Sequence, residues 1–223
     1  MDMSSARATV VGIVPMTQSR KHSYPKLVGE SDDAFDTRTW RGKLNCDFGQ
    51  RITLANEPID ARLVAMDGSE VEDASIVMPA HGFHQCMASA AKYSQRKIVG
   101  QRNATWTGKF TAGIMVMANP RLNLHPNAVD SIEIFAHANG QRGSGKRVPR
   151  RLPIIPRGWR ATIEVMILDP IITQQMFVEM LELAGLYVGM GQFRPQNGGV
   201  NGRFQLESLD WQDNRSFVLA KTA

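Results

Sequence analysis

A glycine-rich stretch with two arginines, at residues 186 to 209, is the first segment suited to binding. Its glycines separate a helical pattern that ends near Leu186 from an alternating pattern that begins at Arg203. Glycine permits positive φ and close backbone approach, and Arg194 and Arg203 add positive charge. We expect this loop to lie along the backbone of a polyanion, with Phe193 free to stack on a base. The glycines are Gly189, Gly191, Gly198, Gly199 and Gly202.

Residues 139 to 160 form the most basic stretch of the chain, with seven cations and no acidic residue. Such a density of charge requires a polyanion or open solvent around it. Trp106, which lies among further cations, and Trp159 are candidates for stacking on bases. A Trp106 that simply packs in a basic loop is an equal alternative. The seven cations are Arg142, Lys146, Arg147, Arg150, Arg151, Arg157 and Arg160.

Part of this stretch comes close to a nucleotide-binding P-loop. The segment GQRGSGK, from Gly140 to Lys146, has the spacing and the lysine of that motif. Arg147 stands where a Ser or Thr would hold Mg²⁺, and Pro149 with Pro153 prevents the long helix that must follow. We therefore expect no ATP hydrolysis and no nucleotide cofactor.

Two clusters have residue types that bind metals or move protons. His81, His84 and Cys86 suggest zinc, but Cys86 lies off the face that the two histidines share on a helix, and no fourth ligand is evident. Asp32, Asp33 and Asp36 are better explained as a solvated acidic turn than as ligands or acid-base groups. We predict no metal site and no cofactor.

The composition is that of a folded protein with a mild preference for anionic partners. Lys and Arg number 26 against 21 acidic residues, and the formal net charge is +5. Only two cysteines are present, which favours a reducing compartment, and no segment is long and apolar enough to span a membrane or to act as a signal peptide. We expect a cytoplasmic protein, in the host cytoplasm if it is encoded by a phage.

The elements that must position these residues follow the order of a ferredoxin-like fold. Apart from one additional strand, the order is β-α-β-β-α-β, so we predict an α+β, RRM-like core with one sheet face free for a ligand. The whole chain, 1–223, is expected to be one domain with insertions at 17–50 and 139–158, a hairpin at 51–66 and a polar tail at 212–223. The expected core elements are strands at 8–16, 110–117, 131–137, 159–168 and 203–209, and helices at 80–93 and 174–186.

Two segments resemble the RAMP superfamily, the RRM-like backbone proteins of CRISPR effector complexes. AGLYVGMGQFRPQNGGVNGRF, from Ala184 to Phe204, is similar to the family's glycine-rich loop, and VMPAHGFHQCMASAA, from Val77 to Ala91, to its strand-proline-helix entry. GESDDAFDTRTW, from Gly29 to Trp40, resembles a stretch of uncharacterised bacteriophage proteins. The resemblance implies a sequence-tolerant grip on single-stranded nucleic acid by protomers arranged side by side.

The same resemblance supplies candidates for catalysis. RAMP endoribonucleases that process guide RNA usually employ a histidine, for which His22, His81 and His84 are candidates. Backbone subunits that cut target RNA use a loop aspartate, for which Asp32, Asp33 or Asp36 are candidates. Three functions remain open: non-catalytic binding of single-stranded RNA or DNA by a homo-oligomer, which we favour, a metal-independent endoribonuclease, and a subunit that assembles with other proteins.

Overall fold

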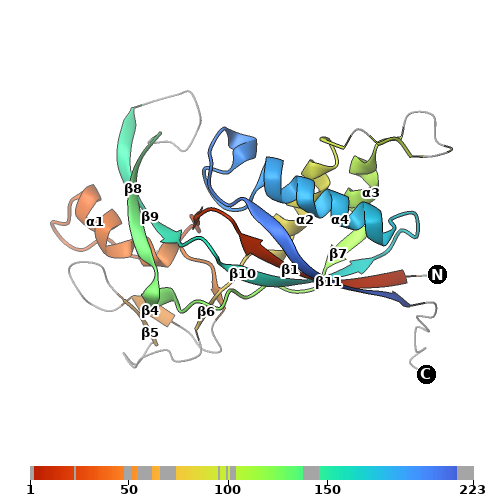
Figure 1. Cartoon of the computed structure of the whole chain (residues 1–223). Coiled ribbons are helices and arrows are strands. Elements are labelled where there is room, and N and C mark those ends of the chain that lie inside the picture. The colour runs from red at the N-terminus through yellow and green to blue at the C-terminus, as the bar shows by residue number, and fades with distance from the viewer. Residues whose placement is uncertain are drawn as a thin grey trace, which may run out of the picture.

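The computed structural model describes residues 3–22, 24–47, 52–54, 62–65, 74–94, 96–98, 100, 104–137 and 146–214. It is a mixed α+β fold with antiparallel sheets and four α-helices. A four-stranded sheet in the order β11-β1-β10-β7 forms the core, as Figure 1 shows. Its strands are β1 (Met3–Gly12), β7 (Ile114–Val116), β10 (Arg160–Ile167) and β11 (Phe204–Asn214).

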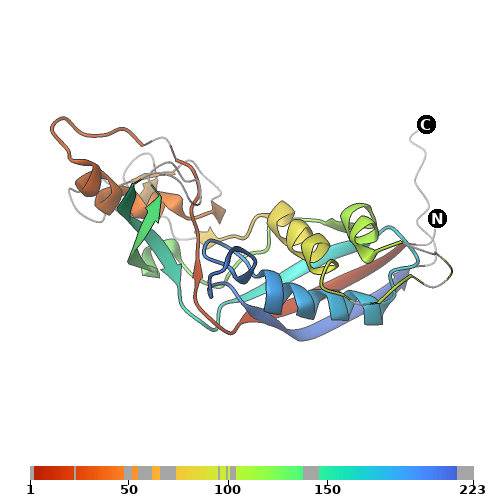
Figure 2. The same ribbon diagram turned by 90° about the horizontal axis from the view of Figure 1, so that it is seen from above.

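Two long helices pack on one face of this sheet, and no element among the described residues covers the other (Figure 2). They are α2 (Ala80–Ala90) and α4 (Gln174–Leu183). The chain thus runs β1-α2-β7-β10-α4-β11, with the last strand beside the first, which is compatible with the predicted ferredoxin-like core. We call the uncovered side of the core sheet the open face.

Alternation of residue types sets the two faces of the core strands. In β10 every second residue, from Ala161 to Ile167, is buried against the helices, while Arg160, Thr162 and Glu164 are exposed. The helices contribute apolar residues at helical spacing, and Thr173 caps α4 by accepting a hydrogen bond from the Met176 N–H at 3.3 Å. The buried helical residues are Phe83, Cys86, Met87, Ala90, Met176, Phe177, Met180 and Leu181.

The expected strand at 110–117 is wrong over its first half. Residues Trp106–Ala112 form a helix, α3, because Trp106 and Phe110 stand one helical turn apart and both are buried. Gly113 ends this helix, with its N–H bonded to the Lys109 carbonyl at 2.7 Å, and only Ile114–Val116 is left for β7.

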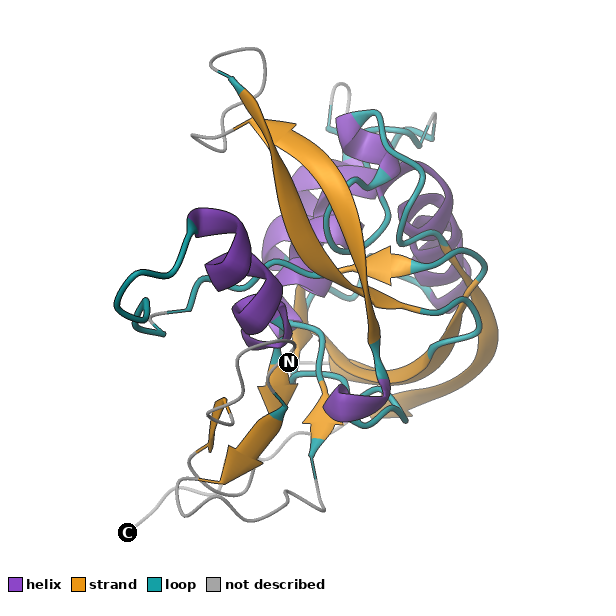
Figure 3. Cartoon of the chain, turned by 90° about the vertical axis from the view of Figure 1, so that its left-hand side faces the viewer, coloured by secondary structure: helices purple, strands orange, loops and turns teal. Residues whose placement is uncertain are grey.

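A second sheet in the order β2-β9-β8 stands beside the core. It consists of β2 (Met16–Thr17), β8 (Asp130–His137) and β9 (Arg147–Ile155). The additional strand expected at 131–137 is therefore β8, and β9 lies within the stretch 139–158 that was expected to be an insertion. We call the β8–β9 pair the arm. It lies at the end of the molecule opposite the start of β1 (Figures 1 and 3).

The remaining elements are short and come from the segments between core elements. The predicted hairpin is present as β4 (Ile52–Leu54) paired with β5 (Leu63–Ala65), and β3 (Cys46–Asp47) pairs with β6 (Ser75–Ile76). The 17–50 segment also contains α1 (Asp32–Thr39) and the 3₁₀ turn η1 (Trp40–Lys43). Further one-turn elements are η2 (Pro126–Ala128), the π-helical turn η3 (Ala184–Val188) and η4 (Pro195–Asn197).

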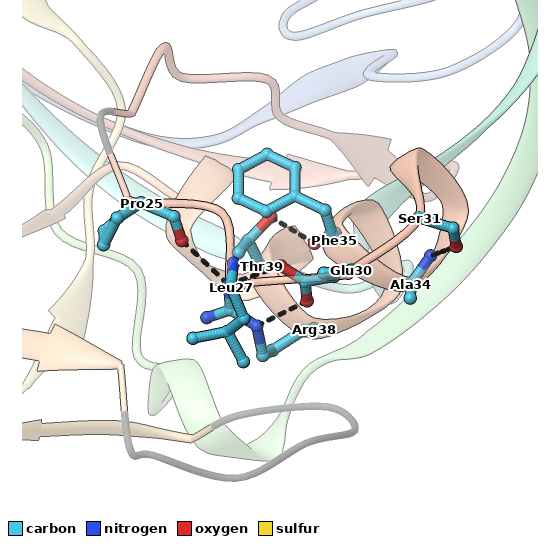
Figure 4. A network of polar contacts seen from close by, with 8 residues as sticks. All are labelled: Pro25, Leu27, Glu30, Ser31, Ala34, Phe35, Arg38 and Thr39. Atoms are coloured by element: carbon cyan, nitrogen blue, oxygen red, sulfur yellow. Dashed lines mark hydrogen bonds and ion pairs between the residues drawn. The ribbon is translucent and has the colours of Figure 1, made fainter.

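Helix α1 is anchored by a buried ion pair. Arg38 binds Glu30 through two hydrogen bonds of 2.8 and 3.0 Å and also donates to the Pro25 carbonyl at 2.9 Å (Figure 4). Both charged side chains of the pair are less than 10% exposed. The hydrogen bonds from Arg38 lower the pKa of Glu30 to about 2, and the Leu27 N–H, which also bonds to this carboxylate, acts in the same direction.

The interpretation of Asp36 as part of a solvated turn is wrong. Asp32 and Asp33 are exposed in the first turn of α1, but Asp36 is buried and accepts hydrogen bonds from the Lys43 ammonium and the Arg151 N–H. Lys43 in turn donates to the Arg151 carbonyl at 2.6 Å. Strand β2 pairs only with the last two residues of β9, Ile154 and Ile155. The Asp36 and Lys43 side chains therefore bond to the edge of β9 at Arg151, which β2 does not cover.

We expect Asp36→Ala to destabilise the fold by about 3–5 kcal/mol, because it leaves the Lys43 ammonium buried without its counter-charge and the Arg151 N–H without an acceptor. Asp33→Ala removes an exposed charge from the same helix and should cost less than about 1 kcal/mol. Urea denaturation of both variants measures these losses. Equal losses in the two variants would contradict a structural role for the buried pair.

Candidate nucleic-acid interface

The arm has exposed cations that lack an acidic partner. Lys146 and Arg147 are exposed at the start of β9, and Arg157 is exposed just after its end. None of these three forms an ion pair with any acidic residue in the described part of the chain. Arg142, predicted from the same stretch, lies outside the described residues. The unpaired positive charge is therefore at the outer part of the arm and at its base.

The other predicted cations of this stretch have different surroundings. The Arg151 Nη2 lies 3.6 Å from Glu133 across the arm, and the Arg160 Nη2 lies 2.9 Å from Glu207 on the open face. Arg150 is half-buried, and its charge helps the hydrogen bond from Lys26 to lower the pKa of Asp32. Arg151 and Arg160 are thus partly neutralised, and the seven cations do not form one continuous patch.

The arm also presents an aromatic residue that the sequence analysis missed. Phe135 is 66% exposed, the highest exposure of any aromatic ring in the described residues. Because it lies opposite Pro149 in the strand register, it shares a face with Arg147 and Arg151. The available signal was an aromatic residue on the polar face of an alternating strand, next to Glu133 on that face.

The glycine-rich loop packs against itself and against the backbone of Thr17. A Cβ at Gly202 would meet the Met190 carbonyl oxygen at 1.8 Å, and one at Gly191 would meet the Thr17 carbonyl oxygen at 2.2 Å. Both residues have positive φ, of 73° and 77°. Gly189 and Gly199 make similarly close contacts within the loop, whereas Gly198 is exposed in a left-handed turn. These contacts make the loop a packing element.

Hydrogen bonds join this loop to the second sheet. The Gln192 N–H donates to the Thr17 carbonyl at 2.8 Å, and the Thr17 hydroxyl donates to the Gln192 carbonyl at 2.9 Å. The Gly202 N–H donates to the Pro15 carbonyl at 2.8 Å. Gln192 therefore pairs with Thr17 of β2 on the side away from β9, and the loop connects the core to the base of the arm.

The charged and aromatic residues of the loop are only partly available to a ligand. Arg203 donates to the Leu186 and Val200 carbonyls, both at 3.2 Å. Arg194 is half-buried. Phe193 has a positive φ of 55° and is 39% exposed, so it keeps part of its ring at the surface. The Arg203 guanidinium therefore donates hydrogen bonds to the backbone of its own loop, which leaves fewer donors for a ligand.

The two tryptophans considered for stacking are buried. Trp106 is 6% exposed and packs edge-on against Phe110, and Trp159 is 2% exposed and donates to the Val14 carbonyl at 3.3 Å. The packed Trp106 that was the alternative expectation is therefore what the structure has. Neither ring stands on the surface as Phe135 does.

The candidate histidines come from separate places in the fold. His81 is exposed on α2, and a ring nitrogen of His84 lies 2.9 Å from the Thr111 carbonyl. His22 packs against the Tyr24 ring, and burial lowers its pKa. Cys86 is fully buried beside two backbone carbonyls, and burial raises its pKa to about 12. Over the described ranges, His, Cys, Asp and Glu side chains form no group of three that could hold a metal ion.

Comparisons with known proteins complete the description. No helix among the described residues has the length and apolar character needed to cross a membrane. No protein-family model matches the chain, and no curated protein matches it. A solved chain to which it is similar comes from the type III-B Cmr-beta complex bound to cognate target RNA, with 9% identity and a TM-score of 0.46. That similarity covers 95% of this chain and 61% of the other.

We expect Gly202→Ala to destabilise the protein by more than about 1–3 kcal/mol, because a left-handed φ and a backbone clash add in the same residue. Gly108→Ala is the matched control, since it lies within α3 with open space around it and should stabilise by about 0.5–1 kcal/mol. Thermal unfolding measures both. A Gly202→Ala variant that is as stable as the unmodified protein would show that the loop backbone tolerates a Cβ.

Proposed function

We propose that this protein binds single-stranded nucleic acid with little sequence preference, and that the arm is the main interface. The observation that carries the proposal is the exposed ring of Phe135 on β8 beside exposed cations at both ends of β9. These cations, which form no ion pair among the described residues, are Lys146, Arg147 and Arg157. Cations neutralise phosphates and release counterions, while an exposed ring stacks on any base. Neither contact depends on base identity.

The open face is less suited to this task than the arm. Arg7 pairs with Glu164 at 2.7 Å, and Arg160 pairs with Glu207, so the cations there already have acidic partners. Asp210 adds an exposed acid on the neighbouring strand. A nucleic acid would have to displace these pairs and would meet negative charge. On the sequence alone, we expect single-stranded nucleic acid to lie beside the open face. We now propose that it binds along the arm.

The proposal is for a binding role, with protomers side by side along the strand as the resemblance to the RAMP superfamily implies. The glycine-rich loop supports binding indirectly, because it fixes β2 and thereby the base of the arm. Among the described residues, His22 and His84 contact an aromatic ring and a backbone carbonyl, which favours structural roles for both. Retention of intact RNA after incubation with the protein is the expected result.

We expect Arg147→Ala/Arg157→Ala to weaken binding of labelled single-stranded RNA and DNA in fluorescence anisotropy. Loss of two phosphate contacts should also reduce the slope of log affinity against log salt by about 1.4. Phe135→Ala should cost about 1–3 kcal/mol of binding and leave the salt slope unchanged, because stacking releases no counterions.

Arg7→Ala is the control, since it removes one exposed cation from the open face. It should leave affinity almost unchanged. The proposal fails if neither oligonucleotide binds at about 50 mM salt, or if Arg7→Ala weakens binding as much as the arm variants do.

A further inference from the structure

A cavity of about 410 Å³ lies between the end of α2 and the start of α3. Its lining combines three cations, Lys92, Arg96 and Lys97, with three hydroxyl groups, those of Ser94, Thr105 and Thr107. None of the described residues that line it is acidic. Hydrogen-bond donors and positive charge that converge on a cavity are the chemistry that recognises phosphate.

Trp106 forms an apolar part of the cavity wall. Its side chain lines the cavity and is 6% exposed. Its indole Nε1 is buried, with no hydrogen-bond partner among the described residues, and it is out of reach of a ligand in the cavity. The donors that the cavity offers are therefore its cations and its hydroxyl groups.

The two lysines of the cavity are free to meet a ligand. Glu179, on α4, accepts a hydrogen bond from Ser94 at 3.3 Å and pairs with Arg96 at 2.8 Å. Lys92 and Lys97 are exposed, and neither pairs with an acid within the described ranges. Positive charge thus remains after the internal pair with Arg96 is counted.

An exposed aromatic pair stands next to the cavity. Tyr93, which lies between Lys92 and Ser94 in sequence, stacks on Tyr187 with ring centroids 5.3 Å apart and an interplanar angle of 21°. The two rings are 44% and 46% exposed. They come from the turn after α2 and from the π-helical turn η3. A base is the planar group that such a surface accommodates by stacking.

We propose that this cavity binds the phosphate of a nucleotide whose base stacks on the Tyr93–Tyr187 pair. Lys92 and Lys97 contact the phosphate oxygens, and the hydroxyls of Thr105 and Thr107 supply neutral donors from the cavity wall. The site is separate from the arm, which lies at the other end of the molecule (Figures 1 and 2). It does not depend on the proposed function of the arm.

Isothermal titration calorimetry of the full chain with AMP and with inorganic phosphate tests this site. Lys92→Ala/Lys97→Ala should weaken binding of both ligands about 10-fold or more, since charge-assisted contacts are lost. Tyr187→Ala should weaken AMP alone, because inorganic phosphate has no base to stack.

Two controls separate this site from the arm. Arg147→Ala/Arg157→Ala should leave AMP binding unchanged, and melting temperatures should confirm that each variant is folded. Comparison of 5′-phosphorylated with 5′-hydroxyl oligonucleotides shows whether the phosphate of a strand end enters the same cavity. If the protein binds the 5′-phosphorylated oligonucleotide more tightly, Lys92→Ala/Lys97→Ala should abolish this preference. That result would support the site and identify the end of a strand as the source of the phosphate.

The proposal is overturned if AMP, inorganic phosphate and the 5′-phosphate all give no signal up to about 10 mM ligand. A dissociation constant above that concentration is weaker than the proposed contacts would supply. It is also overturned if binding is the same in the Lys92→Ala/Lys97→Ala variant, or if the arm variants abolish it.

Discussion

The buried contact of Asp36 and Lys43 with the backbone of Arg151 is the interaction on which the arm depends. A two-stranded hairpin is marginally stable in water, and β2 covers only the last two residues of β9. One carboxylate and one ammonium satisfy the backbone N–H and carbonyl of Arg151 at the edge that β2 does not cover. Because both charges are buried, the pair tolerates loss of either partner poorly. This constraint explains why α1 and η1 are inserted between core elements.

The glycine-rich loop provides a second support for the arm, from the core side. It leaves α4 through the π-helical turn η3 and bonds to Thr17 before it enters β11. Its glycines allow backbones to approach more closely than a side chain would permit. The arm is therefore fixed along one edge of β9, at Arg151 by α1 and η1 and at Ile154 and Ile155 by β2, which this loop supports. A rigid base of this kind suits an element that presents cations and a ring to a flexible polymer.

Periodicity predicted the core well, because burial against one layer of helices imposes a simple pattern. The alternation after Trp159 gave β10, and Thr173 correctly marked the start of α4. The order of elements was enough to predict the ferredoxin-like arrangement. Local patterns failed where a partner far away in sequence decided the outcome. Asp36 is buried by Arg151, more than a hundred residues away, and no local signal encodes that contact.

The sequence predicted which basic stretch forms the candidate interface, but not which of its cations are unpaired. The basic stretch pointed to the region of the arm, yet its division into free and paired cations depends on Glu133 and Glu207, which lie on other strands. Trp106 has the residue type of a stacking platform, but tertiary packing buries it, while Phe135 is exposed. The exposure of Phe135 depends on the register of β8 against β9, whereas Trp106 is buried by the packing of α3.

Ultraviolet cross-linking of a bound single-stranded oligonucleotide, followed by mass spectrometry of the digested protein, tests the central claim most directly. The account predicts that adducts concentrate on peptides from β8 and the segment from Lys146 to Arg157, with Phe135 among the modified residues. Adducts confined to the open face, on peptides of β1, β10 and β11, would contradict the account.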